Sequence, residues 1–87
     1  MKSYFVTFRS VTHAQRGEQA LSRSGYRCRL RRTPRWMEER GCGYGVEVKL
    51  GTLEEGLDAL RRQQLAWRRI WLVKPGGEME EVGHDLS

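Results

Sequence analysis

The stretch YRCRLRRT, residues 26–33, alternates strictly between two kinds of side chain. Alternation of this kind is typical of a strand with one buried and one solvated face, because successive side chains of an extended chain point to opposite sides. The inward set is Tyr26, Cys28 and Leu30, and the outward set is Arg27, Arg29 and Arg31. The stretch therefore predicts a half-buried strand whose outer face carries arginines.

A second alternating stretch, YGVEVKL, follows at residues 44–50. Its apolar positions predict an inward face, and Glu47 and Lys49 predict an outward one. The two stretches are separated by residues 34–43, a segment with a proline and glycines, so we expect them to form a hairpin with a long loop.

The flanking sequence predicts two further strands and two helices. Residues 3–9 and 67–74 are rich in aromatic and β-branched types, which favours strands. Thr12 followed by Gln15, and Thr52 followed by Glu55, match the capping-box spacing, so helices are expected to begin near His13 and Leu53. Gly25 is placed to end the first helix.

The resulting order, β-α-β-β-α-β, is that of an α+β, ferredoxin-like fold. Right-handed crossovers place both helices on one face of a four-stranded antiparallel sheet, with the strands in spatial order 4-1-3-2. With 87 residues, one domain is expected over residues 1–74. Residues 75–87, which begin with Pro-Gly-Gly and then turn acidic, are expected to be a mobile C-terminal tail.

Composition limits the classes of function. Two cysteines do not make a disulfide framework, and the two histidines are far from them in sequence, so neither a disulfide scaffold nor a metal site is expected. No cofactor motif is recognisable. The N-terminus has no sustained apolar run and no stretch is long enough to span a bilayer, so we expect a cytoplasmic protein without membrane contact.

The charge is uneven along the chain. Of 16 basic residues 13 are arginine, and the net charge is +5. Residues 75–87 contain four acids and no lysine or arginine, so the preceding residues are more basic than the whole. A basic body can attract nucleic acid or another anion, although the same composition also fits an ordinary solvated surface.

Cys42 lies between Gly41 and Gly43, where the hairpin loop enters the strand at residues 44–50. Flanking glycines let backbone N–H groups and a partner approach the sulfur. Arg35 and other loop arginines supply cations, which lower the pKa of a thiol and favour its reactive thiolate. Cys42 is thus a candidate reactive cysteine, although a small residue in a flexible turn would show the same pattern. Cys28, on the inward face, is expected to be a core residue.

The outward face of the sheet is the second candidate site. It is expected to present aromatic and basic side chains together, as base-stacking RNA-binding sheets do. The aromatic-rich strand signature of those modules is absent, and a solvated face or a homodimer surface is the competing interpretation. The residues concerned are Phe5, Arg27, Arg29, Arg31 and Trp71.

The chain resembles a selenium/sulfur-carrier-like family of small bacterial domains, long catalogued as a domain of unknown function. The resemblance rests on YFVTFRSVTHAQ at residues 4–15, on TPR at 33–35, and on CGYGVEV at 42–48 after a six-residue gap, and it runs from about Tyr4 to Val73. It implies a thiol that carries sulfur or selenium between enzymes. By position, the carrier cysteine is Cys42, with Gly43, Pro34 and Arg35 as matching neighbours.

Three functions remain open on sequence grounds. In the first, Cys42 carries sulfur or selenium as a persulfide or its selenium counterpart, or acts as a redox-sensitive thiol, Arg35 stabilises the anion and Gly43 leaves room for backbone donors. Such a protein is a carrier with donor and acceptor partners rather than a turnover enzyme. In the second, the basic sheet face binds RNA or an acidic protein. In the third, the domain is a structural or dimeric accessory without chemistry.

Overall fold

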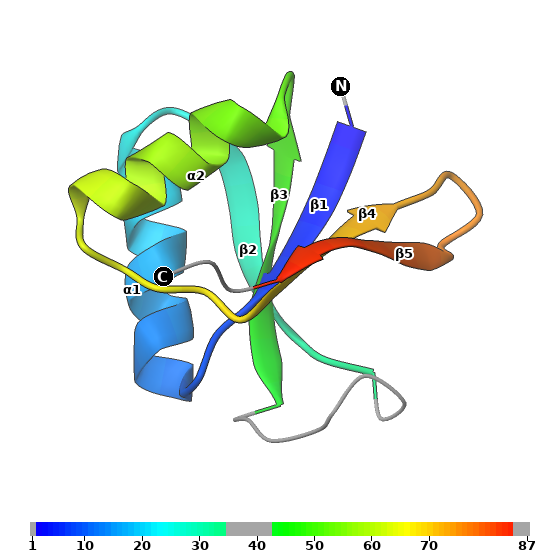
Figure 1. Ribbon diagram of the computed structural model, residues 1–87, viewed down its shortest axis with the longest axis horizontal. Helices are drawn as coiled ribbons and strands as arrows, with labels where there is room; N and C mark the ends of the chain where they lie inside the picture. Colours follow the sequence, from blue (N-terminus) through cyan, green and yellow to red (C-terminus); the bar gives the residue numbers. More distant parts are fainter. Residues whose placement is uncertain (1, 35–42, 85–87) are drawn as a thin grey trace.

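The computed structural model describes residues 2–34 and 43–84, which form a two-layer α+β structure (Figure 1). Two helices lie on one side of a five-stranded antiparallel sheet. The strands are ordered β2-β3-β1-β4-β5 across the sheet. The elements are β1 (Lys2–Thr7), α1 (Val11–Arg23), β2 (Arg27–Arg32), β3 (Tyr44–Leu50), α2 (Leu53–Arg62), β4 (Arg69–Val73) and β5 (Met79–His84).

The first six elements have the predicted β-α-β-β-α-β order, and their strands have the predicted spatial order. The expectation of a four-stranded sheet is wrong by one strand. β5 lies within residues 75–87, the segment expected to be a tail, and pairs antiparallel with β4. The four acids of residues 75–87 were interpreted as a sign of disorder, but strand pairing requires only backbone groups and an exposed edge tolerates charge.

A tight hairpin turn brings β5 back against β4. The amide of Gly77 donates to the carbonyl oxygen of Lys74 at 2.8 Å, and the amide of Lys74 donates to the carbonyl oxygen of Glu78 at 2.7 Å. Gly77 has φ 90°, a left-handed conformation that favours glycine. A three-residue loop that ends in such a glycine is a common hairpin connection, so Pro-Gly-Gly was a hairpin signal as well as a strand end.

The core fills the space between the helices and one face of the sheet. Even-numbered residues of the central strands point into it, as the alternating pattern predicts, and meet the apolar side of each helix. Phe8 lies against Gly17 of α1, where a Cβ atom would come within 2.5 Å of the ring. The fully buried side chains include Val6, Phe8, Leu21, Val46, Val48, Leu50 and Leu60.

The helix ends differ in part from the prediction. α1 begins at Val11, and its N-cap is Ser10 rather than Thr12, because the Ser10 hydroxyl accepts a hydrogen bond from the amide of His13. α1 ends at Arg23 with Ser24 as its C-cap, and Gly25, the glycine predicted to end the helix, follows with φ 91°. The amide of Tyr26 donates to the carbonyl oxygen of Leu21 at 3.1 Å, the hydrogen bond of a Schellman motif.

Among residues 2–34 and 43–84, neither helix has the length and apolar character that crossing a bilayer would require.

Candidate functional site

The β2–β3 hairpin is held together up to the base of its loop. Beyond the paired residues Arg32 and Tyr44, the amide of Thr33 donates to the carbonyl oxygen of Gly43 at 2.7 Å. Gly43 has φ 73°, so the chain leaves the loop through a left-handed residue, where a Cβ atom would be strained. Cys42 and Arg35 belong to residues 35–42, outside the part of the chain that the structure describes. Cys42 is the residue bonded to this anchored glycine.

The base of the loop is cationic. Among residues 30–34 and 43–46, the charged side chains are those of Arg31 and Arg32. Arg31 forms an ion pair with Glu47, whereas the guanidinium of Arg32 lies 5.7 Å from the centroid of the Tyr44 ring. A cation over an aromatic ring keeps its charge, so Arg32 adds positive potential at this end of the sheet.

Thr33 adds an unusual polar atom at the same place. Its side chain is buried, and Oγ1 has no hydrogen-bond partner among the described residues. A buried hydroxyl without a partner is costly, and it keeps its capacity to donate a hydrogen bond to an anion. Thr33 begins the Thr-Pro-Arg motif of residues 33–35, but its burial could not be predicted from that motif, because burial depends on the strands that pack around it.

Cys28 lies in different surroundings. Its side chain is half-buried against the core, and Sγ donates to the carbonyl oxygen of Glu18 at 3.3 Å. Burial, followed by the nearby charge of Glu18, raises the pKa of the Cys28 thiol. Cys28 is therefore a thiol with little thiolate character at neutral pH.

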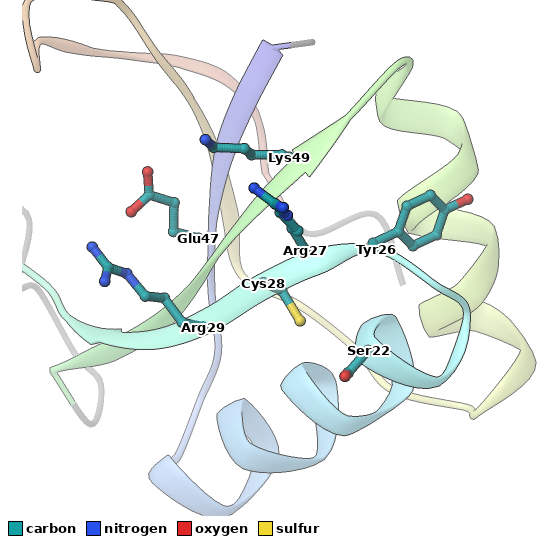
Figure 2. Close-up of a pocket in the computed structure, with 7 residues that line it drawn as sticks. All are labelled: Ser22, Tyr26, Arg27, Cys28, Arg29, Glu47 and Lys49. Carbon is teal, nitrogen blue, oxygen red and sulfur yellow. The ribbon is translucent and has the colours of Figure 1, made fainter.

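The edge of β2 carries a surface hollow of about 570 Å³ that Cys28 lines in part. Figure 2 shows Cys28 directed toward α1 and Ser22, whereas Glu47 points away on the other side of the sheet. The hollow thus wraps around the strand edge, and its arginines do not lie on the side of the sulfur.

Strand register places all five residues predicted for a binding face on the side of the sheet that faces away from the helices, here called the open sheet face. One row across it runs Arg29, Glu47, Phe5, Trp71, Glu81. Arg27 and Arg31 lie on either side of Arg29 in this face. The period-2 pattern in the sequence thus assigned these residues to the correct face.

Two features of the open sheet face oppose the binding of a nucleic acid. Phe5 is only 1% exposed, and its ring lies over Gly45, where a Cβ atom would come within 2.7 Å of Cζ. The face also carries its own acids, since Glu47 pairs with Arg31, and Glu81 pairs with Arg69 at 2.7 Å. Phe5 therefore offers no ring area to a stacking base, and two of the cations are already neutralised.

Among the described residues, no group of three or more histidine, cysteine, aspartate or glutamate side chains is arranged to hold a metal ion.

Comparison with known proteins gives one family. The sequence model of a family described as "Putative Se/S carrier protein-like" matches residues 3–72. No curated protein and no solved structure matches the chain. The matched segment runs from Ser3 in β1 to Leu72 in β4 and includes both strands of the β2–β3 hairpin.

Proposed function

Since the chain belongs to the Se/S carrier protein-like family, we propose that it carries sulfur or selenium on the thiol of Cys42. The domain is then ferredoxin-like with one added edge strand, and the carrier cysteine lies in the loop of its central hairpin. The observation that carries the proposal is the anchored, cationic base of this loop, formed by Thr33, Gly43 and Arg32.

The base of the β2–β3 loop favours an anionic sulfur in three ways. Arg32 provides positive potential, which lowers the pKa of a nearby thiol. The buried Thr33 hydroxyl can donate to an anion at the same end. Gly43, which has no Cβ atom, leaves room for a donor molecule beside Cys42. Arg35, the residue after Pro34, is the proposed stabiliser of the bound anion.

The carrier step is thiol exchange and needs no outside oxidant. The Cys42 thiolate attacks the outer sulfur of a persulfide donor, R–S–SH. The donor S–S bond breaks, a new S–S bond forms between Sγ of Cys42 and the transferred sulfur, and the donor leaves as the thiolate R–S⁻. Selenium follows the same course from R–S–SeH, and the acceptor reverses the step. Because the reaction needs a free thiol, we expect it in a reducing compartment such as the cytoplasm, with donor and acceptor proteins as partners.

The pKa of each thiol tests the proposal. Alkylation by iodoacetamide is followed against pH in the Cys28→Ser variant, which reports Cys42, and in the Cys42→Ser variant, which reports Cys28. We expect Cys42 to titrate below the ordinary value of about 8.5 and Cys28 above it. Arg32→Gln should raise the pKa of Cys42, and Arg32→Lys should restore it. A Cys42 value at or above that of free cysteine would refute the proposal.

The raised pKa of Cys28 also gives the sign of a pH effect on stability. A thiol whose pKa is higher in the folded state stabilises the protein fully below its unfolded pKa. This contribution is lost as the pH rises through the folded value. The free energy of unfolding should therefore fall on the alkaline side, and less so in Cys28→Ser.

Sulfur transfer itself is followed by mass spectrometry. After incubation with cysteine persulfide, the wild-type chain and Cys28→Ser should each gain one sulfur atom that a reductant removes. Cys42→Ser should gain none. Equal labelling of Cys28 and Cys42 would show that Cys42 has no special role.

The alternative proposal is a non-catalytic module that uses the open sheet face to bind RNA or an acidic protein. Arg27 and Arg29 on the exposed part of that face support it. The burial of Phe5 and the ion pairs of Arg31 and Arg69 weigh against it. Charge-neutralising changes at Arg27 and Arg29 would weaken RNA binding if this alternative were right.

A further inference from the structure

A second hollow, of about 480 Å³, lies between α1 and the connection from α2 to β4, here called the helix hollow. Its basic side comes from α1 and from Arg9, two residues before the helix, and its other side comes from the turn after α2. Leu65 and Ala20, both buried, are among its lining residues. The polar residues that line it include Arg9, His13, Arg16, Arg23, Gln63 and Gln64.

The basic residues of the helix hollow form one row. His13, Arg16 and Arg23 are spaced three and seven residues apart, which places them on one side of an α-helix. Arg16 and Arg23 are two turns apart, or about 10.5 Å along the helix axis. Arg9, before the helix, extends the row toward the end of the sheet where Thr7 pairs with Gly45.

Among residues 2–34 and 43–84, this row has no acidic counterpart. None of the described residues that line the helix hollow is aspartate or glutamate. Glu18 is the one acid on α1, and its carboxylate accepts a hydrogen bond from the Leu30 amide at 2.7 Å, on the side of β2. Within the described part of the chain, no ion pair involves Arg9, Arg16 or Arg23.

The walls of the helix hollow are fixed before any ligand arrives. The amide of Leu65 donates to the carbonyl oxygen of Leu60 at 3.0 Å, and the amide of Gln64 donates to that of Arg61 at 2.9 Å, which closes the turn after α2. Near the other end, Ser10 Oγ and His13 Nδ1 are 2.6 Å apart. Since this hydroxyl already accepts from the His13 amide, it can donate to Nδ1, which leaves Nε2–H as a donor.

From these observations we propose that the helix hollow binds the phosphate backbone of a single-stranded nucleic acid. The three cations of this row, Arg9, Arg16 and Arg23, match successive phosphates of an extended strand better than one small anion. The described residues of the helix hollow form one such row, whereas a duplex presents two phosphate backbones across a groove. None of the described residues that line the hollow is aromatic, so recognition is of the backbone and independent of sequence.

The test is the affinity of a fluorescein-labelled oligothymidylate for the full chain, measured by fluorescence anisotropy over a range of salt concentrations. Each phosphate contact contributes about 0.7 to the slope of log affinity against log salt for a single strand. Arg16→Gln and Arg23→Gln should each weaken binding several-fold and reduce this slope by about one contact. Arg16→Lys, which keeps the charge, should retain the slope.

Arg27→Gln and Arg29→Gln are the matched controls, because they make the same change of net charge on the open sheet face. They should leave affinity and slope nearly unchanged. An equal loss in these controls would overturn the proposal, since binding would then follow net charge or the sheet face. So would a duplex of equal length that binds as tightly, or inorganic pyrophosphate that displaces the strand at equal phosphate concentration.

The same measurement on Cys42→Ser separates this proposal from the carrier function. We expect this variant to bind the strand as the wild type does, whatever the thiol chemistry shows. All the arginine variants change exposed side chains, so circular dichroism should show an unaltered fold.

Discussion

The open sheet face and the helix hollow are both rich in arginine, but they differ in what surrounds the cations. On the sheet face, cross-strand pairing sets Glu47 and Glu81 among the arginines, and two ion pairs result. Along α1 the carboxylate of Glu18 is turned toward β2, and no acid is among the described residues that line the hollow. The comparison shows that a count of arginines does not locate an anion site. The positions of the acids decide where the positive potential remains.

The packing of Phe5 in the open sheet face can be disrupted at Gly45. Replacing Gly45 with alanine would place Cβ 2.7 Å from both the Phe5 ring and the carbonyl oxygen of Val6, and the backbone atom cannot move cheaply. We expect a loss of about 2 kcal/mol in the free energy of unfolding, in the range of overpacked sites. Urea denaturation followed by tryptophan fluorescence measures it.

Gly76→Ala is the control for this change. No atom lies within 4 Å of a Cβ atom built at Gly76, so its effect should stay within about 0.5 kcal/mol. Equal stability of both variants would mean that Phe5 does not pack tightly on the strand beside it.

A substitution at Gln64 tests the backbone strain in the turn that forms one wall of the helix hollow. This residue has φ 57°, the left-handed conformation that costs a non-glycine residue about 1 kcal/mol. Gln64→Gly should therefore raise the free energy of unfolding by up to about 1 kcal/mol. Gln63→Gly, one residue earlier at φ −93°, should give no gain. A Gln64→Gly variant less stable than the wild type would show that the Gln64 side chain contributes more than its backbone strain costs.

Much of the arrangement of the open sheet face could be predicted from the sequence, because it depends on short-range periodicity. Alternation in residues 26–33 and 44–50 assigned the arginines and Glu47 to one face correctly. The burial of Phe5 could not be predicted, since it depends on Gly45 of the paired strand. β5 was not predicted, because its acids favoured a mobile tail, although the Pro-Gly-Gly turn before it is typical of a hairpin.

The helix hollow was missed for a different reason. The spacing of His13, Arg16 and Arg23 is visible in the sequence, but the opposite wall comes from the turn after α2, which is distant along the chain. For the proposed carrier site, the signal in the sequence was local. Cys42 and Arg35 were singled out from a local motif and lie outside the described residues, so their roles stay predictions.

The smallest expected effect tests whether Glu47 and Glu81 prevent the open sheet face from binding nucleic acid. Changing both Glu47 and Glu81 to glutamine removes the partners of Arg31 and Arg69. Affinity for oligothymidylate should then rise several-fold, which is less than about 1.4 kcal/mol. A further Arg29→Gln change should remove the gain, because the newly active surface is the one that contains Arg29.

The matched control changes two acids on α2 instead, in the variant Glu54→Gln/Asp58→Asn. Both of these acids are exposed and lie near Arg61, so their loss alters net charge equally without touching the sheet face. If this control raised affinity as much as the Glu47 and Glu81 changes, the acids of the sheet would act only through net charge. The contrast between the two surfaces would then rest on the geometry of the helix hollow alone.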